Sequence, residues 1–149
     1  MENIKRSPQE LERWSFLWSE VRLVIAAFAL FLGGVPPIYR ILPVAGLFGI
    51  EGFLVRLCWI VSGVAAAYLL YRWNATGQKV FGGKQTKDVV AFFVSVVSGL
   101  NLGIAGLISV NIGMRIAAGA VIFIIVGLVY LAAAWQLYTR WKASGKNLF

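Results

Sequence analysis

The sequence predicts an all-α integral membrane protein with four transmembrane helices, arranged as two parallel helical-hairpin repeats after an N-terminal amphipathic helix. Three observations lead to this fold class. Of the 149 residues, 60% are hydrophobic and 13% are charged, and the mean hydropathy is +0.79. The apolar residues gather in four runs, and two segments of the chain match each other. So much apolar side chain cannot be buried in one small water-soluble core.

Four apolar runs approach the length of about 20 residues that crosses a bilayer. They cover residues 23–38, 53–71, 89–110 and 116–138. Helices that are apolar on every side belong in lipid, so we expect all four runs to span the membrane. The first run contains Pro36-Pro37, a pair that lacks two backbone donors and therefore either breaks this span or ends it.

The segment before the first run has the pattern of an amphipathic helix. Ser7 and Glu10 have the spacing of a capping box, and Pro8 suits the first helical position. Apolar residues then recur at helical spacing with charged residues between them. Two interpretations follow: residues 1–20 lie at the level of the lipid headgroups, or they form the polar end of the first spanning helix.

Two ten-residue segments of the chain match each other. Residues 72–81 read RWNATGQKVF, and residues 140–149 read RWKASGKNLF. We therefore predict an N-terminal segment (1–20), a first two-helix repeat (21–81) and a second (82–149). Each repeat has two spans, so both repeats enter the membrane from the same side and are parallel. Further matches pair Gly33-Gly34 with Ser98-Gly99, Ala45-Gly46-Leu47 with Ala105-Gly106-Leu107, and Ile60–Gly63 with Ile124–Gly127.

Basic residues are unevenly distributed along a chain whose formal net charge is +8. Most of them flank the predicted spans on one side, and the positive-inside rule makes that side cytoplasmic. We therefore expect a multi-pass protein of the cytoplasmic (inner) membrane, with both termini and the central loop facing the cytoplasm and anionic lipid headgroups. Nucleic acid is not expected as a partner, because the basic residues do not form one stripe. The residues on the cytoplasmic side are Lys5, Arg6, Arg13, Arg22, Arg72, Lys79, Lys84, Lys87, Arg140, Lys142 and Lys146, against Arg40, Arg56 and Arg115 on the other.

Few polar side chains lie in or beside the predicted spans, and these are the candidate functional residues. Asn101 either bonds to a neighbouring helix or forms a polar constriction in a conduit, for which Ser62 and Ser98 are further candidates. Glu51 is interpreted as a solvated carboxylate of the outer connection, near Arg56, or as a cation site in an outer vestibule. The small residues expected at helix contacts are Gly63, Gly99, Gly103 and Gly127. Cys58 is expected to be a small buried hydrophobe.

Residues 98–107, Ser-Gly-Leu-Asn-Leu-Gly-Ile-Ala-Gly-Leu, with Asn111 after them, resemble the signature of a family of small two-helix bacterial membrane proteins, the domain of unknown function DUF378. The second repeat keeps the Asn and the glycines of that signature, with Leu102 where the family has Trp. The first repeat keeps only residues 45–50. The resemblance implies a tandem two-helix membrane fold and no particular activity.

The chain has no histidine and a single cysteine. These counts exclude histidine-ligated haem or zinc, histidine-dependent acid–base catalysis and an internal disulfide, so we expect no enzyme, no bound metal and no cofactor. Two functions remain. The first is a non-enzymatic helical bundle that acts by packing, as a self-associating scaffold or an accessory subunit of a larger membrane complex. The alternative is a small oligomeric channel or transporter for ions or small solutes.

Overall fold

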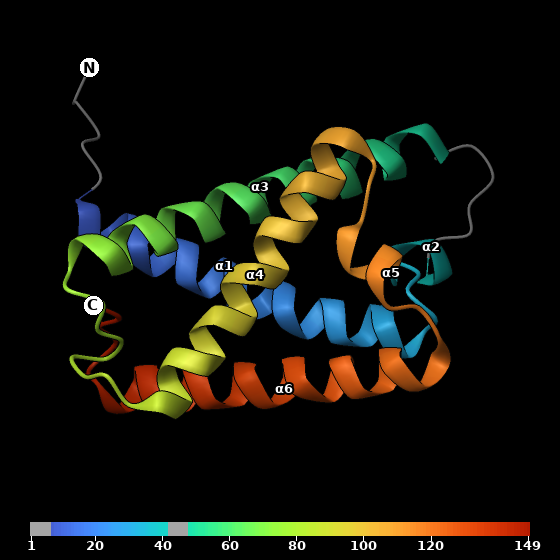
Figure 1. Cartoon of the computed structure of the whole chain (residues 1–149). Helices are drawn as coiled ribbons and strands as arrows, with labels where there is room; N and C mark the ends of the chain where they lie inside the picture. The colour runs from blue at the N-terminus through green and yellow to red at the C-terminus, as the bar shows by residue number, and fades with distance from the viewer. Residues whose placement is uncertain (1–6, 42–47) are drawn as a thin grey trace, which may run out of the picture.

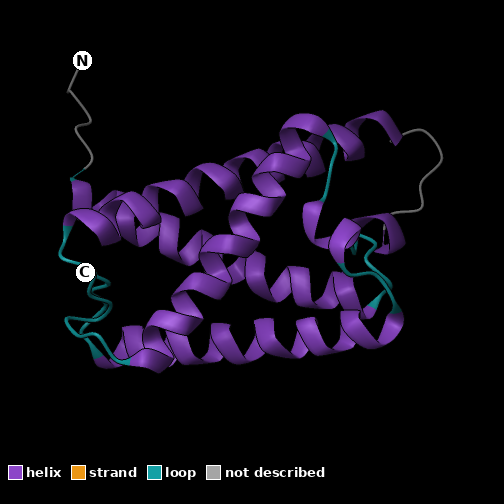
Figure 2. Ribbon diagram, viewed as in Figure 1, coloured by secondary structure: helices purple, strands orange, loops and turns teal. Residues whose placement is uncertain are grey.

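The computed structural model describes residues 7–41 and 48–149, and within them every regular element is a helix (Figure 2). The four long helices are long and apolar enough to span a membrane, which confirms the predicted all-α fold with four candidate spans. Lys5, Arg6 and the predicted match at Ala45-Gly46-Leu47 lie outside the described residues. The helices are α1 (Pro8–Phe31), α2 (Ile38–Ile41), α3 (Phe48–Ala75), α4 (Thr86–Ile108), α5 (Ile112–Ile116) and α6 (Ala120–Ala143).

The four long helices form two closely packed pairs. Helix α3 packs along α4, and α1 packs along α6, while the contacts of α1 with α3 and of α4 with α6 are less extensive (Figure 1). The start of α1, the end of α6 and the α3–α4 loop lie at one end of the bundle, which we call the terminal end. Helices α2 and α5 lie at the opposite end. The hydrophobic core, which includes Phe16, Phe92 and Leu137, lies toward the terminal end.

Helix α1 is continuous through the predicted boundary at residues 20 and 21. It begins at Pro8, and the hydroxyl of its N-cap Ser7 accepts a 3.3 Å hydrogen bond from the Glu10 N–H, as the capping pattern predicted. Gln9, Glu10 and Arg13 are exposed at its start, but from Trp14 onward its exposed side chains are apolar and its polar side chains face the other helices. This inverted arrangement lets the helix carry several polar residues and still present an apolar surface. The buried polar residues are Glu12, Ser15, Ser19, Glu20 and Arg22.

The first span ends at Phe31, earlier than the apolar run predicted, because two glycines terminate the helix. Gly33 has a φ of +81°, and the N–H of Gly34 donates a 2.8 Å hydrogen bond to the carbonyl of Ala29. These are the features of a Schellman motif. Pro36-Pro37 therefore follows the helix and does not break it.

The matching ten-residue segments end α3 and α6 in the same way. Gly77 and Gly145 have φ values of +81° and +70°, which L side chains rarely adopt. The N–H of the next residue then donates 2.9 Å back into the helix, from Gln78 to Trp73 and from Lys146 to Trp141. The glycine that the two segments share therefore turns the chain out of the helix at the end of both α3 and α6.

An ion pair joins the two long helices of each hairpin. Arg72 of α3 pairs with Glu12 of α1, and Arg140 of α6 pairs with Asp88 of α4 across 2.9 Å. The Asp88 carboxylate is fully buried and also accepts a 2.7 Å hydrogen bond from Gln136. Both pairs lie at the terminal end and hold each hairpin closed there.

Aromatic contacts join the hairpins to each other near these ion pairs. The Trp141 ring lies 5.3 Å from that of Phe16 in α1, and the Trp73 ring lies 6.1 Å from that of Phe92 in α4. Each tryptophan therefore packs on the phenylalanine of the other hairpin.

Helices α1 and α4 bury equivalent positions. Ser98 lies 76 positions after Arg22, and at this shift every buried residue of α1, from Glu12 to Ala27, has a buried counterpart in α4. This register differs from the predicted one, which placed Gly33-Gly34 opposite Ser98-Gly99. The glycine pair follows α1, whereas Ser98-Gly99 lies inside α4.

Candidate functional site

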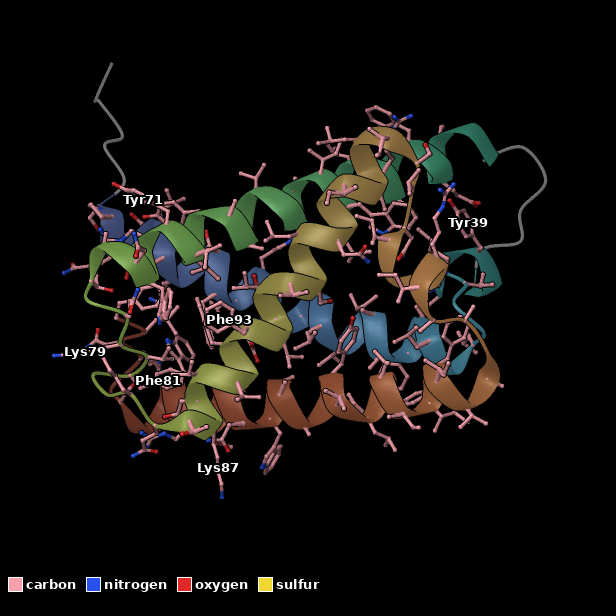
Figure 3. The ribbon with its side chains drawn as sticks, in the orientation of Figure 1. Tyr39, Tyr71, Lys79, Phe81, Lys87 and Phe93 are labelled. Carbon is pink, nitrogen blue, oxygen red and sulfur yellow. The ribbon has the colours of Figure 1, made fainter. Side chains whose placement is uncertain are left out.

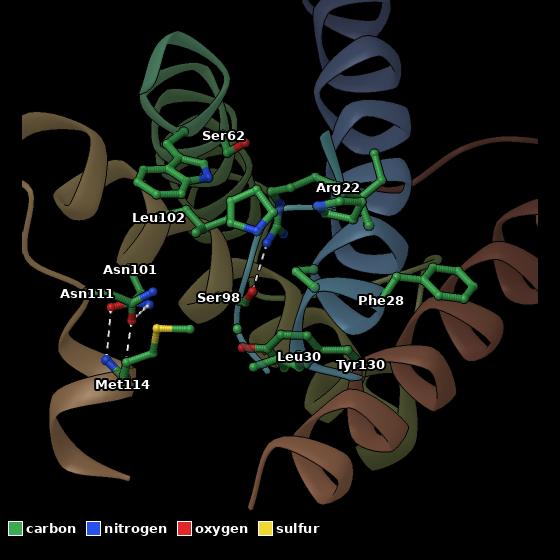
Figure 4. Close-up of a pocket in the computed structure, with 18 of the residues that line it drawn as sticks. Arg22, Phe28, Leu30, Ser62, Ser98, Asn101, Leu102, Asn111, Met114 and Tyr130 are labelled. Carbon is green, nitrogen blue, oxygen red and sulfur yellow. Dashed lines mark hydrogen bonds between the residues drawn. The ribbon is translucent and has the colours of Figure 1, made fainter. Parts of the chain in front are cut away.

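A cavity of about 870 Å³ lies between the long helices, toward the end that holds α2 and α5. Residues from α1, α3, α4, α5 and α6 line it, and most of the lining side chains are apolar. Figure 4 shows Phe28, Leu30, Leu102 and Met114 around it. The cavity occurs where the two helix pairs diverge, away from the hydrophobic core.

Arg22 is the charged residue of the cavity wall. It is 6% exposed, and its Nη1 donates a 2.8 Å hydrogen bond to the Ser98 hydroxyl (Figure 4). Its Nη2 donates to the carbonyl and the hydroxyl of Ser95, at 2.8 and 3.2 Å. Its Nε has no hydrogen-bond partner within residues 7–41 and 48–149. The expectation that Arg22 belongs to the cytoplasmic flank is therefore wrong, because its side chain lies inside the bundle.

Ser62 of α3 connects two helices beside the cavity. Its hydroxyl donates 2.7 Å to the carbonyl of Cys58 and accepts a 3.1 Å hydrogen bond from Nε1 of Trp18 in α1. The predicted burial of Cys58 is wrong. It is exposed on the surface of the bundle, at the rim of the cavity, because the other described helices leave this face of α3 uncovered.

Asn101 is hydrogen-bonded to the connection between α4 and α6. Its Nδ2 donates a 2.9 Å hydrogen bond to Oδ1 of Asn111, and its Oδ1 accepts one of 3.2 Å from the N–H of Gly113. Asn111 caps α5 by accepting a 3.1 Å hydrogen bond from the Met114 N–H. The amide therefore fixes α5 against α4 and forms part of the cavity wall (Figure 4).

The solvated-loop interpretation of Glu51 is wrong. Glu51 lies in the first turn of α3, is 4% exposed, and one of its carboxylate oxygens has no hydrogen-bond partner among the described residues. Arg56 turns instead to the end of α4 and donates to the carbonyls of Gly106 and Leu107, at 2.6 and 3.0 Å. A cation at a helix C-terminus satisfies free carbonyls and opposes the helix dipole. Glu51 lies outside the described lining of the cavity.

The predicted packing glycines lie at helix contacts. A Cβ on Gly63 would come within 2.5 Å of the Gly103 Cα, so α3 and α4 meet backbone to backbone at this point. A Cβ on Gly99 would lie 2.7 Å from that of Ala66 on α3, and one on Gly127 of α6 would collide with the ring of Phe31 on α1. These glycines set the close approach within both helix pairs.

The structure brings together three of the four candidate polar residues. Ser62, Ser98 and Asn101 line one cavity, whereas Glu51 lies apart from it. Arg22, the charged residue of this group, was not among the candidates predicted from the sequence. A sequence pattern could have indicated it: Ser15, Ser19 and Arg22 form a polar stripe at helical spacing. Hydropathy alone hid this stripe, because it divided the segment into a polar flank and an apolar span.

Comparisons of the chain with protein-family models, with curated proteins and with solved structures find no match. The resemblance to the small two-helix family stays a prediction.

Proposed function

We propose that this chain is a non-enzymatic multi-pass membrane protein that acts by helix packing, as a self-associating scaffold or as an accessory subunit of a larger membrane complex. The observation that carries the proposal is the use of its interior polar side chains. Ser62, Ser98 and Asn101, the candidates for either packing or a conduit, each bond to another element of the bundle. Interhelical bonds of this kind fix helices in register.

The proposal includes an internal duplication. Two hairpins, α1–α3 and α4–α6, have matching ion pairs, matching helix ends and matching buried faces. An axis along the membrane normal would relate two such parallel copies. The same axis would relate the α1–α6 contact to the α3–α4 contact. These are the two most extensive helix–helix contacts of the bundle.

We further propose that both termini face the cytoplasm. Lys79 and Lys87 lie at the terminal end, and Tyr39 lies at the other (Figure 3). Without Arg22, the basic residues of the flanks still favour the terminal end. Anionic headgroups attract such residues by about 1 kcal/mol each, so this end suits the cytoplasmic leaflet.

Native mass analysis of the gently extracted protein tests the packing proposal. The expected result is a complex of fixed composition, either an integral number of 16.4 kDa chains or this chain with another membrane protein. The composition should persist on dilution and in a second detergent, which controls for association inside a micelle. A lone chain under all of these conditions would overturn the proposal.

The cavity favours a second candidate function, a small oligomeric channel or transporter. It reaches from the α2–α5 end to Arg22 and Ser98. Beyond them toward the terminal end lies the packed core around Phe16 and Phe92, so conduction would require that core to open. Solute flux into vesicles that contain the purified protein would favour this function over packing.

A further inference from the structure

Arg22 lies deep in the bundle and forms no direct ion pair with a described carboxylate. Glu12 and Asp88 are paired with other arginines, and no described carboxylate forms an ion pair with Arg22. Glu20, two positions earlier, is buried and interacts with Arg22 electrostatically without a direct ion pair, and it lies outside the described lining of the cavity. A buried cation without a directly paired anion is costly in a low-dielectric interior. The Arg22 side chain therefore favours an anionic group in the space beside it.

The polar groups of the cavity form an anion site at one place. Arg22 lines the cavity there, and hydrogen bonds from its Nη1 and Nη2 to Ser98 and Ser95 hold its side chain in position. Tyr130 of α6 lines the same cavity and has a hydroxyl that can donate (Figure 4). A guanidinium with a neighbouring hydroxyl suits a carboxylate or a phosphate.

The remainder of the cavity suits an apolar body. Its walls are mainly aliphatic and aromatic, and its volume of about 870 Å³ falls in the range of sites that enclose small organic ligands. Val21 and Ile25 of α1 and Leu54 and Cys58 of α3 both line the cavity and are exposed on the bundle surface. The cavity therefore opens between α1 and α3 on an apolar face, where a lipid molecule would have access.

From this geometry we infer that the cavity binds an amphiphile with a single anionic headgroup, its headgroup at Arg22 and its chain along the apolar wall. Two sources share this chemistry: a free fatty acid and an anionic phospholipid. The inference goes beyond the packing function and does not depend on it. A protein that is a lone chain but binds the amphiphile would overturn only the packing proposal.

Equilibrium binding of radiolabelled hexadecanoate to the purified protein in a non-ionic detergent tests the inference. We expect saturable binding of one molecule per chain, with hexadecanol competing at least tenfold more weakly than unlabelled hexadecanoate. This comparison uses the unaltered protein, so it holds even if a variant does not fold. Equal competition by the alcohol, or no saturable binding, would overturn the inference.

Substitutions locate the site. Arg22→Gln should weaken hexadecanoate binding at least tenfold and leave hexadecanol binding nearly unchanged. Arg56→Gln is the matched control, because Arg56 caps α4 and lies outside the described cavity lining, and it should bind as the unaltered protein does. Leu102→Trp should block binding by filling the cavity. A folded Arg22→Gln or Leu102→Trp variant that binds hexadecanoate normally would overturn the assignment.

Competition by vesicles of phosphatidic acid, with phosphatidylcholine vesicles as control, separates the two sources. Displacement by phosphatidic acid alone would identify an anionic phospholipid as an occupant. Binding of hexadecanoate without displacement by phosphatidic acid would identify the free fatty acid. Equal displacement by both kinds of vesicle would show that the site does not distinguish an anionic from a zwitterionic headgroup, and would contradict the inference.

Discussion

Nη1 of Arg22 donates a 2.8 Å hydrogen bond to Oγ of Ser98, and Ser98 occupies in α4 the position that Arg22 occupies in α1. In the proposed duplication, a residue that contacts its own counterpart would lie near the axis that relates the two copies. Two arginines at this place would repel each other, whereas an arginine and a serine form a hydrogen bond. The two hairpins therefore differ where they meet, and this difference produces one charged site.

Removing the buried carboxylate of Asp88 should destabilise the bundle. Asp88→Asn replaces a charge that accepts hydrogen bonds from both Arg140 and Gln136. Hydrogen bonds to charged groups contribute about 1.5–3 kcal/mol, so we expect the free energy of unfolding to fall by about that amount. Chemical denaturation in detergent measures the loss. Glu10→Gln, at an exposed position of α1, is the control, and an equal effect of both changes would contradict the role assigned to Asp88.

The Asn101–Asn111 bond should contribute modestly to stability. Asn101→Leu removes an interhelical amide contact, and such contacts contribute about 0.6 kcal/mol on average and up to about 2 kcal/mol. We expect a correspondingly small decrease in Tm. Asn111→Ala and the Asn101→Leu/Asn111→Ala double variant complete a double-mutant cycle. The stability lost in the double variant should be smaller than the sum of the losses in the two single variants. An Asn101→Leu variant of full stability that has lost solute flux would instead support the channel.

A side chain at the α3–α4 crossing should force the helices apart. Gly63→Ala places a Cβ within 2.5 Å of the Gly103 Cα, and overpacking of this kind costs about 1–3 kcal/mol. Gly83→Ala is the matched control, since a Cβ at Gly83 meets no described atom within 4 Å. Thermal unfolding of both variants compares them. If Gly63→Ala is no less stable than Gly83→Ala, the close crossing is not present.

Cysteine labelling should place the α3–α4 loop in the cytoplasm. In a Cys58→Ala background, Gln78→Cys should react with a membrane-impermeant maleimide only after the cells are opened. Ile50→Cys, near the opposite end of α3, should react in intact cells. Labelling of position 78 from outside would reverse the proposed orientation.

The sequence by itself determined the class of the protein and its main helices. Hydropathy located four spans because a bilayer-crossing helix requires a long run of apolar residues, and local capping residues such as Ser7 and Gly77 determined where helices begin and end. The amide of Asn101 was singled out because a polar group in an apolar run needs a partner.

Only the tertiary structure decided which way the polar residues face. Hydropathy averages over a window, so it assigned Arg22 to the flank, although its helix turns it inward to Ser98. Local sequence also left Glu51 in a loop, whereas α3 begins at Phe48 and Glu51 is buried in its first turn. The partner of Glu12 lies 60 positions along the chain, at Arg72, and a contact at that separation has no local signal. It exists because the two helices of the hairpin fold back on each other and bring these charges together.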